Sequence, residues 1–135
     1  MAKTAARLIV GISGASGTVY GVRLLEMLRK TDIETHLVMS KSAEMTLAYE
    51  TDLKAKDVRE LATKCYPVTD IGAAISSGSF PTMGMIIAPC SIRTMSEIAT
   101  GVTSTVTRRA ERSLRTWRRS LPRADVTLAP VVRAQ

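Results

Sequence analysis

Small hydroxyl-bearing and glycine residues gather at three places in this 135-residue chain, namely Ser13–Gly17, Ser40–Ser42 and Pro89–Thr94. The first place is a glycine-rich turn, and such a turn in front of a helix exposes backbone N–H groups that suit an anion such as a phosphate. It lacks the Gly-Lys-Ser/Thr ending of a nucleoside-triphosphate loop, and its glycines are not spaced as in the dinucleotide fingerprint. No acidic residue follows at 40–42 to hold a ribose, so a mononucleotide is favoured over NAD.

The other reactive side chains carry weaker signals. Cys90 lies in the third segment, but no histidine lies near it in sequence to activate the thiol, so we interpret Cys90 as a packed structural residue. His36 is the single histidine of the chain and falls in an apolar run, which is typical of a packed residue. One histidine with Cys65 and Cys90 has no metal-site spacing, and we expect no metal. Glu50, taken alone, is an ordinary solvated carboxylate.

Strands and helices alternate along the chain, and this order predicts how the three segments are positioned. Short apolar runs predict buried strands at 7–12, 34–39 and 84–88, and apolar residues at helical spacing predict helices at 19–28, 43–49, 55–63 and from 95 onward. Alternation of this kind predicts an α/β fold, with a three-layer flavodoxin-like or Rossmann-like parallel sheet covered by helices on both faces. Ligands bind beyond the carboxyl ends of such strands, where all three segments would lie.

The charge of +7 is concentrated near the C-terminus. Residues 1–104 hold eleven Lys and Arg against ten Asp and Glu, a balance of +1, whereas residues 105–135 hold eight Arg against two acids, a balance of +6. We therefore divide the chain into an α/β domain at 1–104 and an Arg-rich tail at 105–135 that is expected to be partly disordered. No apolar run approaches the roughly 18 residues of a membrane span, and no export signal is found, so we expect a cytoplasmic protein.

Five parts of the chain, in the right order and spacing, resemble the UbiX-type flavin prenyltransferase family. They are residues 8–17 with 20–25, then 34–41, 50–52, 75–80 and 85–94. The resemblance implies an FMN-binding domain that joins a dimethylallyl group from dimethylallyl phosphate to reduced FMN without a metal. The product would serve UbiD-type decarboxylases, which are the implied partners, and the family typically forms large homo-oligomers.

The resemblance also implies roles for single residues. The implied cofactor-binding residues are Gly14, Ala15, Ser16, Ser40, Ser91, Ile92, Arg93 and Thr94. Among them, Ser16 would also face the reacting edge of the flavin, and Ser40 would hold the ribityl-phosphate part. Glu50 would be the acid/base or polarising carboxylate beside the prenyl group, so Ser16 and Glu50 are the predicted catalytic residues.

Residues 105–135 depart from the family pattern. The family continues with arginine, glutamate and tyrosine motifs that supply most of the phosphate-binding residues for the prenyl donor, and these are not found in the tail. We expect a frameshifted or truncated version of a longer gene, an incomplete C-terminal part of the fold, and weak FMN binding with little transfer by this chain alone. Two alternatives stay open: a nucleic-acid-binding α/β module with a basic arm, and a flavin-dependent cysteine decarboxylase relative.

Overall fold

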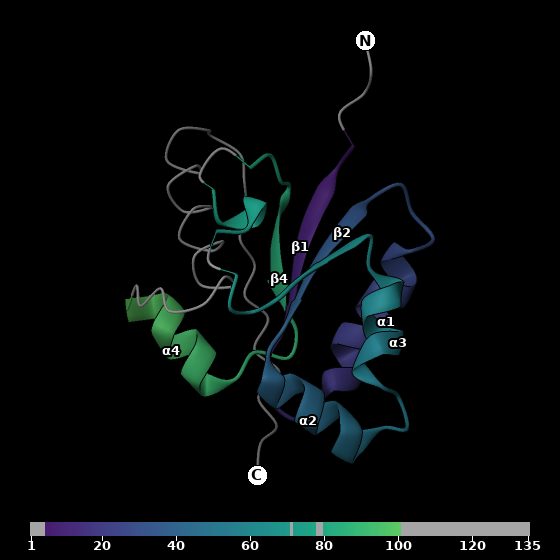
Figure 1. Cartoon of the computed structure of the whole chain (residues 1–135), viewed down its shortest axis with the longest axis vertical. Coiled ribbons are helices and arrows are strands. Elements are labelled where there is room, and N and C mark those ends of the chain that lie inside the picture. The colour runs from purple at the N-terminus through teal and green to yellow at the C-terminus, as the bar shows by residue number, and fades with distance from the viewer. Residues whose placement is uncertain (1–4, 71, 78–79, 101–135) are drawn as a thin grey trace.

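A computed structural model describes residues 5–70, 72–77 and 80–100 of the chain. These ranges form a parallel sheet with strand order β3-β2-β1-β4 (Figure 1). In chain order the elements are β1 (Arg7–Ile12), α1 (Thr18–Leu28), β2 (Glu34–Met39), α2 (Lys41–Glu50), α3 (Ala55–Leu61), β3 (Lys64–Tyr66), the short 3-10 helix η1 (Ala74–Ser76), β4 (Gly84–Ile87) and α4 (Ile92–Thr100). The α/β class predicted from the sequence is confirmed.

The three predicted strands are neighbours in the sheet. β1 lies between β2 and β4, with Arg7 opposite Glu34 and Leu8 opposite Gly84, and all pairs run parallel. The bounds of β1 and β2 are those predicted, and β4 ends one residue earlier than predicted, at Ile87. The carboxyl ends of all three strands therefore point to the same edge of the sheet.

Helices cover both faces of the sheet, which gives the three layers that the sequence predicts. α1, α2 and α3 lie on one side of the sheet and α4 on the other (Figure 1). Successive residues of β1 point to opposite faces: Leu8 and Val10 enter the core under α1, α2 and α3, whereas Ile9 enters the core on the side of α4. A strand buried on both faces must be continuously apolar, as the β1 sequence is.

Hydroxyl caps make two helices begin earlier than predicted. α2 begins at Lys41 because the Ser40 hydroxyl accepts a hydrogen bond from the Ala43 N–H at 3.0 Å. α4 begins at Ile92, after Ser91, whose hydroxyl accepts the Thr94 N–H at 3.1 Å. Such caps satisfy N–H groups that a helix leaves without an internal partner in its first turn.

The region after α2 differs most from the sequence prediction. A helix was predicted over 55–63, but α3 ends at Leu61 and a short strand, β3, follows at Lys64–Tyr66. β3 pairs in parallel with β2 and forms an edge of the sheet. α1 begins at Thr18, one residue earlier than predicted.

Two predictions fall outside the described residues. They are the boundary after residue 104 and the character of the tail at 105–135. Among the helices that the structure describes, none has the length and hydrophobicity required to cross a membrane.

Candidate functional site

Hydrogen bonds join the loops after β1, β2 and β4 at the carboxyl edge of the sheet. The Ser13 N–H donates to the Pro89 carbonyl at 3.2 Å, and the Ser40 N–H donates to the Ile12 carbonyl at 3.1 Å. The Ser91 N–H donates to the Ser13 hydroxyl at 2.6 Å. The three segments singled out in the sequence are therefore brought together by the order of the strands.

The turn after β1 carries backbone donors that are available to a ligand. Within the described part of the chain, no acceptor is found for the N–H groups of Gly14, Ala15 and Ser16. Gly17 has φ 98° and ψ 31°, a left-handed conformation that favours glycine. A Cβ at Gly14 would lie 2.3 Å from that of Ser42, so glycine there allows the first two loops to touch. Free N–H groups of this kind fit the phosphate or the ring carbonyls of FMN.

Glu50, the last residue of α2, reaches the N-terminal end of α1. Its Oε2 accepts a hydrogen bond from the Ser16 hydroxyl at 2.7 Å, and its Oε1 accepts the Gly17 N–H at 3.0 Å. The N–H and the hydroxyl of Thr18 reach Oε1 at 3.5 and 3.4 Å. The two residues predicted to be catalytic are thus in direct contact, although 34 positions separate them in the chain.

These contacts determine the protonation state of Glu50. The hydrogen bond from Ser16 is the largest cause that lowers the pKa of the Glu50 carboxyl, followed by the Gly17 N–H, while partial desolvation opposes it. The N-terminal end of a helix also favours a negative charge. Glu50 is therefore ionised at neutral pH and suited to accept a proton or to stabilise a positive charge. Its exposure leaves it accessible to a ligand.

Ser40 and Ser91 have clear structural roles as helix caps. The Ser40 hydroxyl accepts from a backbone N–H of α2, which leaves its own proton available to a ligand. The Ser91 hydroxyl donates to the Thr94 hydroxyl at 2.9 Å and accepts the Thr94 N–H, so these two side chains bind each other. A part in cofactor binding stays a prediction for all three residues.

Ile92 and Arg93 open α4 at the same edge. The Ile92 side chain is 74% exposed, so it is not packed into the core. Arg93 Nε lies 3.1 Å from Glu97 Oε1, one turn further along α4, and the Arg93 side chain is exposed whereas that of Glu97 is mostly buried. Neither side chain is directed by a described contact toward the turn after β1, and their predicted cofactor contacts stay predictions.

Ser13 is a residue of this site that the sequence analysis missed. It is buried, its hydroxyl donates to the Pro89 carbonyl at 2.8 Å, and it accepts the Ser91 N–H. Ser13 therefore fixes the first loop to the third. A serine directly after a buried strand was visible in the sequence, but nothing in the pattern indicated which loop it would contact.

The remaining reactive side chains are packed, as the sequence suggested. Cys90 is buried and burial raises the pKa of its thiol, which disfavours the nucleophilic thiolate. His36 is buried as well, and its Nδ1 lies 2.9 Å from the Tyr66 hydroxyl. In the described ranges, no three histidine, cysteine or acidic side chains lie close enough together to hold a metal ion.

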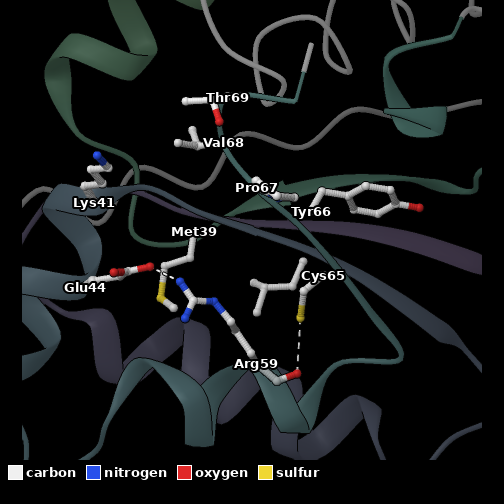
Figure 2. A pocket seen from close by; sticks show the side chains of 10 residues that line it. Met39, Lys41, Glu44, Arg59, Cys65, Tyr66, Pro67, Val68 and Thr69 are labelled. Atoms are coloured by element: carbon white, nitrogen blue, oxygen red, sulfur yellow. Dashed lines mark hydrogen bonds and ion pairs between the residues drawn. The ribbon is translucent and has the colours of Figure 1, made fainter. Parts of the chain in front are cut away.

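A cavity of about 470 Å³ lies beside β2 and β3, and Lys41 is the residue of the three loop segments that lines it. Figure 2 shows Lys41, Glu44, Arg59 and Cys65 around it, with an ion pair between the guanidinium of Arg59 and Glu44. None of the residues predicted to be catalytic or cofactor-binding lines this cavity. The loop edge, not the cavity, is therefore the candidate site.

Comparison with known proteins identifies the family. A family model described as Flavoprotein matches residues 2–132. The chain belongs to the flavoprotein family. The chain is 58% identical over 105 residues to the flavin prenyltransferase UbiX of Escherichia coli K12, an alignment that covers 77% of the chain and 56% of the relative. It is 56% identical over 93 residues to UbiX of Thauera aromatica, an alignment that covers 69% of the chain and 48% of that relative. The chain thus spans about half the length of these curated relatives.

Solved structures agree with this assignment. The chain resembles a dodecameric FMN-dependent UbiX-like decarboxylase from Escherichia coli O157:H7, with a TM-score of 0.86, 42% identity, and coverage of 92% of this chain and 66% of that one. It also resembles AnUbiX (PadA1) in complex with FMN and dimethylallyl pyrophosphate, with a TM-score of 0.82, 41% identity, and coverage of 84% and 60%. The cysteine decarboxylase TvaF, at 16% identity, shares the fold alone. The UbiX-type resemblance is confirmed.

Proposed function

We propose that the edge formed by the loops after β1, β2 and β4 binds FMN. The N–H groups of Gly14, Ala15 and Ser16, which have no acceptor among the described residues, supply donors for anionic or carbonyl oxygens, and the proton of the Ser40 hydroxyl supplies another. Ser91, at the start of α4, closes the edge from the third loop. This ligand is supported by the similar UbiX proteins, which are flavin prenyltransferases, and by the FMN bound in the solved structure of AnUbiX.

The proposed reaction of the whole protein transfers a dimethylallyl group from dimethylallyl phosphate to reduced FMN. Bound reduced FMN would supply the nucleophile, and the prenylated flavin would serve a UbiD-type decarboxylase. The allylic phosphate leaves as an anion, so the protein has to accommodate positive charge on the allyl group in a site that excludes water. An ionised Glu50 at this edge adds negative charge where that stabilisation is required.

The observation that carries the proposal is the hydrogen bond between Ser16 and Glu50 at 2.7 Å. It places a hydroxyl and an ionised carboxylate together beside free backbone donors. The Ser16 hydroxyl donates to Glu50, so its oxygen remains able to accept a hydrogen bond from a ligand. Glu50 can then take up a proton through Ser16 or directly, because both side chains are exposed.

Two measurements test this function. Fluorescence titration of the chain with FMN should show saturable binding, and Ser16→Ala and Glu50→Gln should change the affinity by no more than about threefold. The same changes at the matching positions of a full-length relative should lower dimethylallyl transfer by at least about tenfold, because an interaction strongest in the transition state affects rate more than affinity. Glu60→Gln, which removes an exposed carboxylate on α3, is the matched control.

Equal losses in FMN affinity and in transfer would mean that Ser16 and Glu50 only hold the cofactor. Absence of saturable FMN binding by the chain would refute the proposed ligand.

We also propose that the protein is cytoplasmic and assembles from copies of itself. The dodecameric state of the similar UbiX-like decarboxylase from Escherichia coli O157:H7 supports self-association.

A further inference from the structure

Thr18, the first residue of α1, has a fully buried side chain. A hydroxyl removed from water requires a hydrogen-bond partner, because an unpaired one costs folding free energy. The partner in the structure is Oε1 of Glu50, which lies 3.4 Å from Thr18 Oγ1. Since the Thr18 side chain is inaccessible, it cannot touch a ligand itself, and the contact with Glu50 is the route by which its hydroxyl can influence the loop edge.

The two oxygens of the Glu50 carboxylate share the Gly17 N–H, which lies 3.0 Å from Oε1 and 3.3 Å from Oε2, and each oxygen has a further donor of its own. Oε2 accepts the hydrogen bond from the exposed Ser16 hydroxyl at 2.7 Å. Oε1 faces the helix, where it accepts the Gly17 N–H at 3.0 Å and lies near both donors of Thr18. Rotation of the carboxylate about its last side-chain bond would break both sets of contacts. Donors on Oε1 therefore help to keep Oε2 on Ser16.

We propose that Thr18 is a positioning residue that holds the Glu50 carboxylate in the rotation that binds Ser16. Its importance for turnover rests on the proposed function, but the contact belongs to the ligand-free chain and can be tested without turnover. At 3.4 Å the hydroxyl contact is longer than the ordinary 2.5–3.0 Å of such bonds, so its effect is smaller than that of Ser16.

The test compares Thr18→Val, which keeps the branched shape and removes the hydroxyl, with Thr18→Ser, which restores the hydroxyl. Carbon-13 NMR titration of the Glu50 carboxyl in the full chain, without ligand, gives its pKa in each protein. Thr18→Val should raise this pKa, because the ionised form loses a donor, and Thr18→Ser should return it toward that of the wild type. Thr46→Val is the matched control, since the Thr46 hydroxyl donates to the Ser42 carbonyl within α2.

A second measurement connects the contact to the reaction. In a full-length relative, the change that matches Thr18→Val should lower the kcat of dimethylallyl transfer by about threefold to tenfold, with the affinity for FMN unchanged. Thr18→Ala provides a second hydroxyl-free variant if the valine variant does not fold. Both hydroxyl-free variants are compared with Thr18→Ser.

Two results would overturn the proposal. One is a Glu50 titration that is the same in the hydroxyl-free variants as in the wild type. The other is an equal shift in Thr46→Val, which would indicate a general effect on the helices. Failure of the wild-type chain to bind FMN would count against the proposed function instead, and the titration would still decide whether Thr18 positions Glu50.

Discussion

Replacement of Gly21 by alanine tests whether the close approach of α1 to the sheet determines the geometry of the loop edge. A Cβ at Gly21 would lie 2.3 Å from the carbonyl oxygen of Ala88 and 2.9 Å from the Ile12 side chain. The Ala88 oxygen belongs to the backbone, and the Ala88 N–H is itself hydrogen-bonded to the Gly11 carbonyl at 2.9 Å. The obstacle therefore cannot move as freely as the end of a side chain.

Two opposing effects set the magnitude of the change. Alanine is favoured over glycine inside a helix by about 1 kcal/mol. The new Cβ, however, would be about 1 Å closer to Ala88 than the 3.4 Å at which ordinary contact begins. Overpacking usually costs about 1–3 kcal/mol, and contact with backbone places Gly21→Ala toward the upper end. We expect a net destabilisation of about 1–2 kcal/mol, or a fall in Tm of about 5–10 °C.

Urea and thermal unfolding measure this effect, and FMN titration shows whether the loop edge is displaced with α1. Gly72→Ala is the matched control, because its Cβ would meet only the Asp70 side chain, at 3.7 Å, and should change stability by less than about 0.5 kcal/mol. If Gly21→Ala were as stable as the wild type and bound FMN equally well, the close approach of α1 would not control the site.

Two further predictions concern the buried titratable groups. Burial lowers the pKa of His36 despite its contact with Glu34. The unfolded chain therefore binds a proton at His36 more readily than the folded chain does. The folded state keeps its full stability above about pH 6.5 and loses part of it as the pH falls below that value. In urea unfolding between pH 7 and pH 5.5, His36→Gln should therefore lose less stability than the wild type, and equal losses would contradict this reasoning. In the native protein, a thiol reagent should modify the half-buried Cys65 before the buried Cys90, and in urea it should modify both quickly. Equal rates of modification in the native protein would show that Cys90 is accessible.

The strands show what periodicity can predict here. β1 and β2 were located to the residue. β1 is apolar from Leu8 to the serine that follows it, and β2, which begins with three polar residues, ends on an apolar run at 37–39 before Ser40. β3 was missed because only three residues, Lys64–Tyr66, form it, and their burial runs from exposed to buried. Too few residues are present for a period, and the strand exists because β2 offers it a parallel partner.

The site was predictable to the level of its loops but not of its contacts. Parallel topology alone places the three polar segments at one edge. The role of Glu50 came from the family resemblance, since an isolated carboxylate after a helix has no distinguishing pattern. Its contact with Ser16, and the links that Ser13 and Thr18 make, depend on how α2 returns toward α1. The spacing of residues along the chain does not indicate how the end of α2 comes to lie beside the start of α1.

Glu50 joins a structural function to the proposed chemical one. Its carboxylate ties the end of α2 to the start of α1 through Ser16 and Gly17, and it satisfies N–H groups that the helix leaves unpaired. A ligand anion cannot use the same donors without displacing Glu50, so the free N–H groups of the preceding turn are the better place for a phosphate or a flavin carbonyl. Protonation of Glu50 would weaken its hydrogen bonds to Ser16 and Gly17, and with them the packing of the loop edge. Variants of Glu50 therefore change both stability and chemistry, whereas Thr18→Val leaves the carboxylate in place and alters only how it is held.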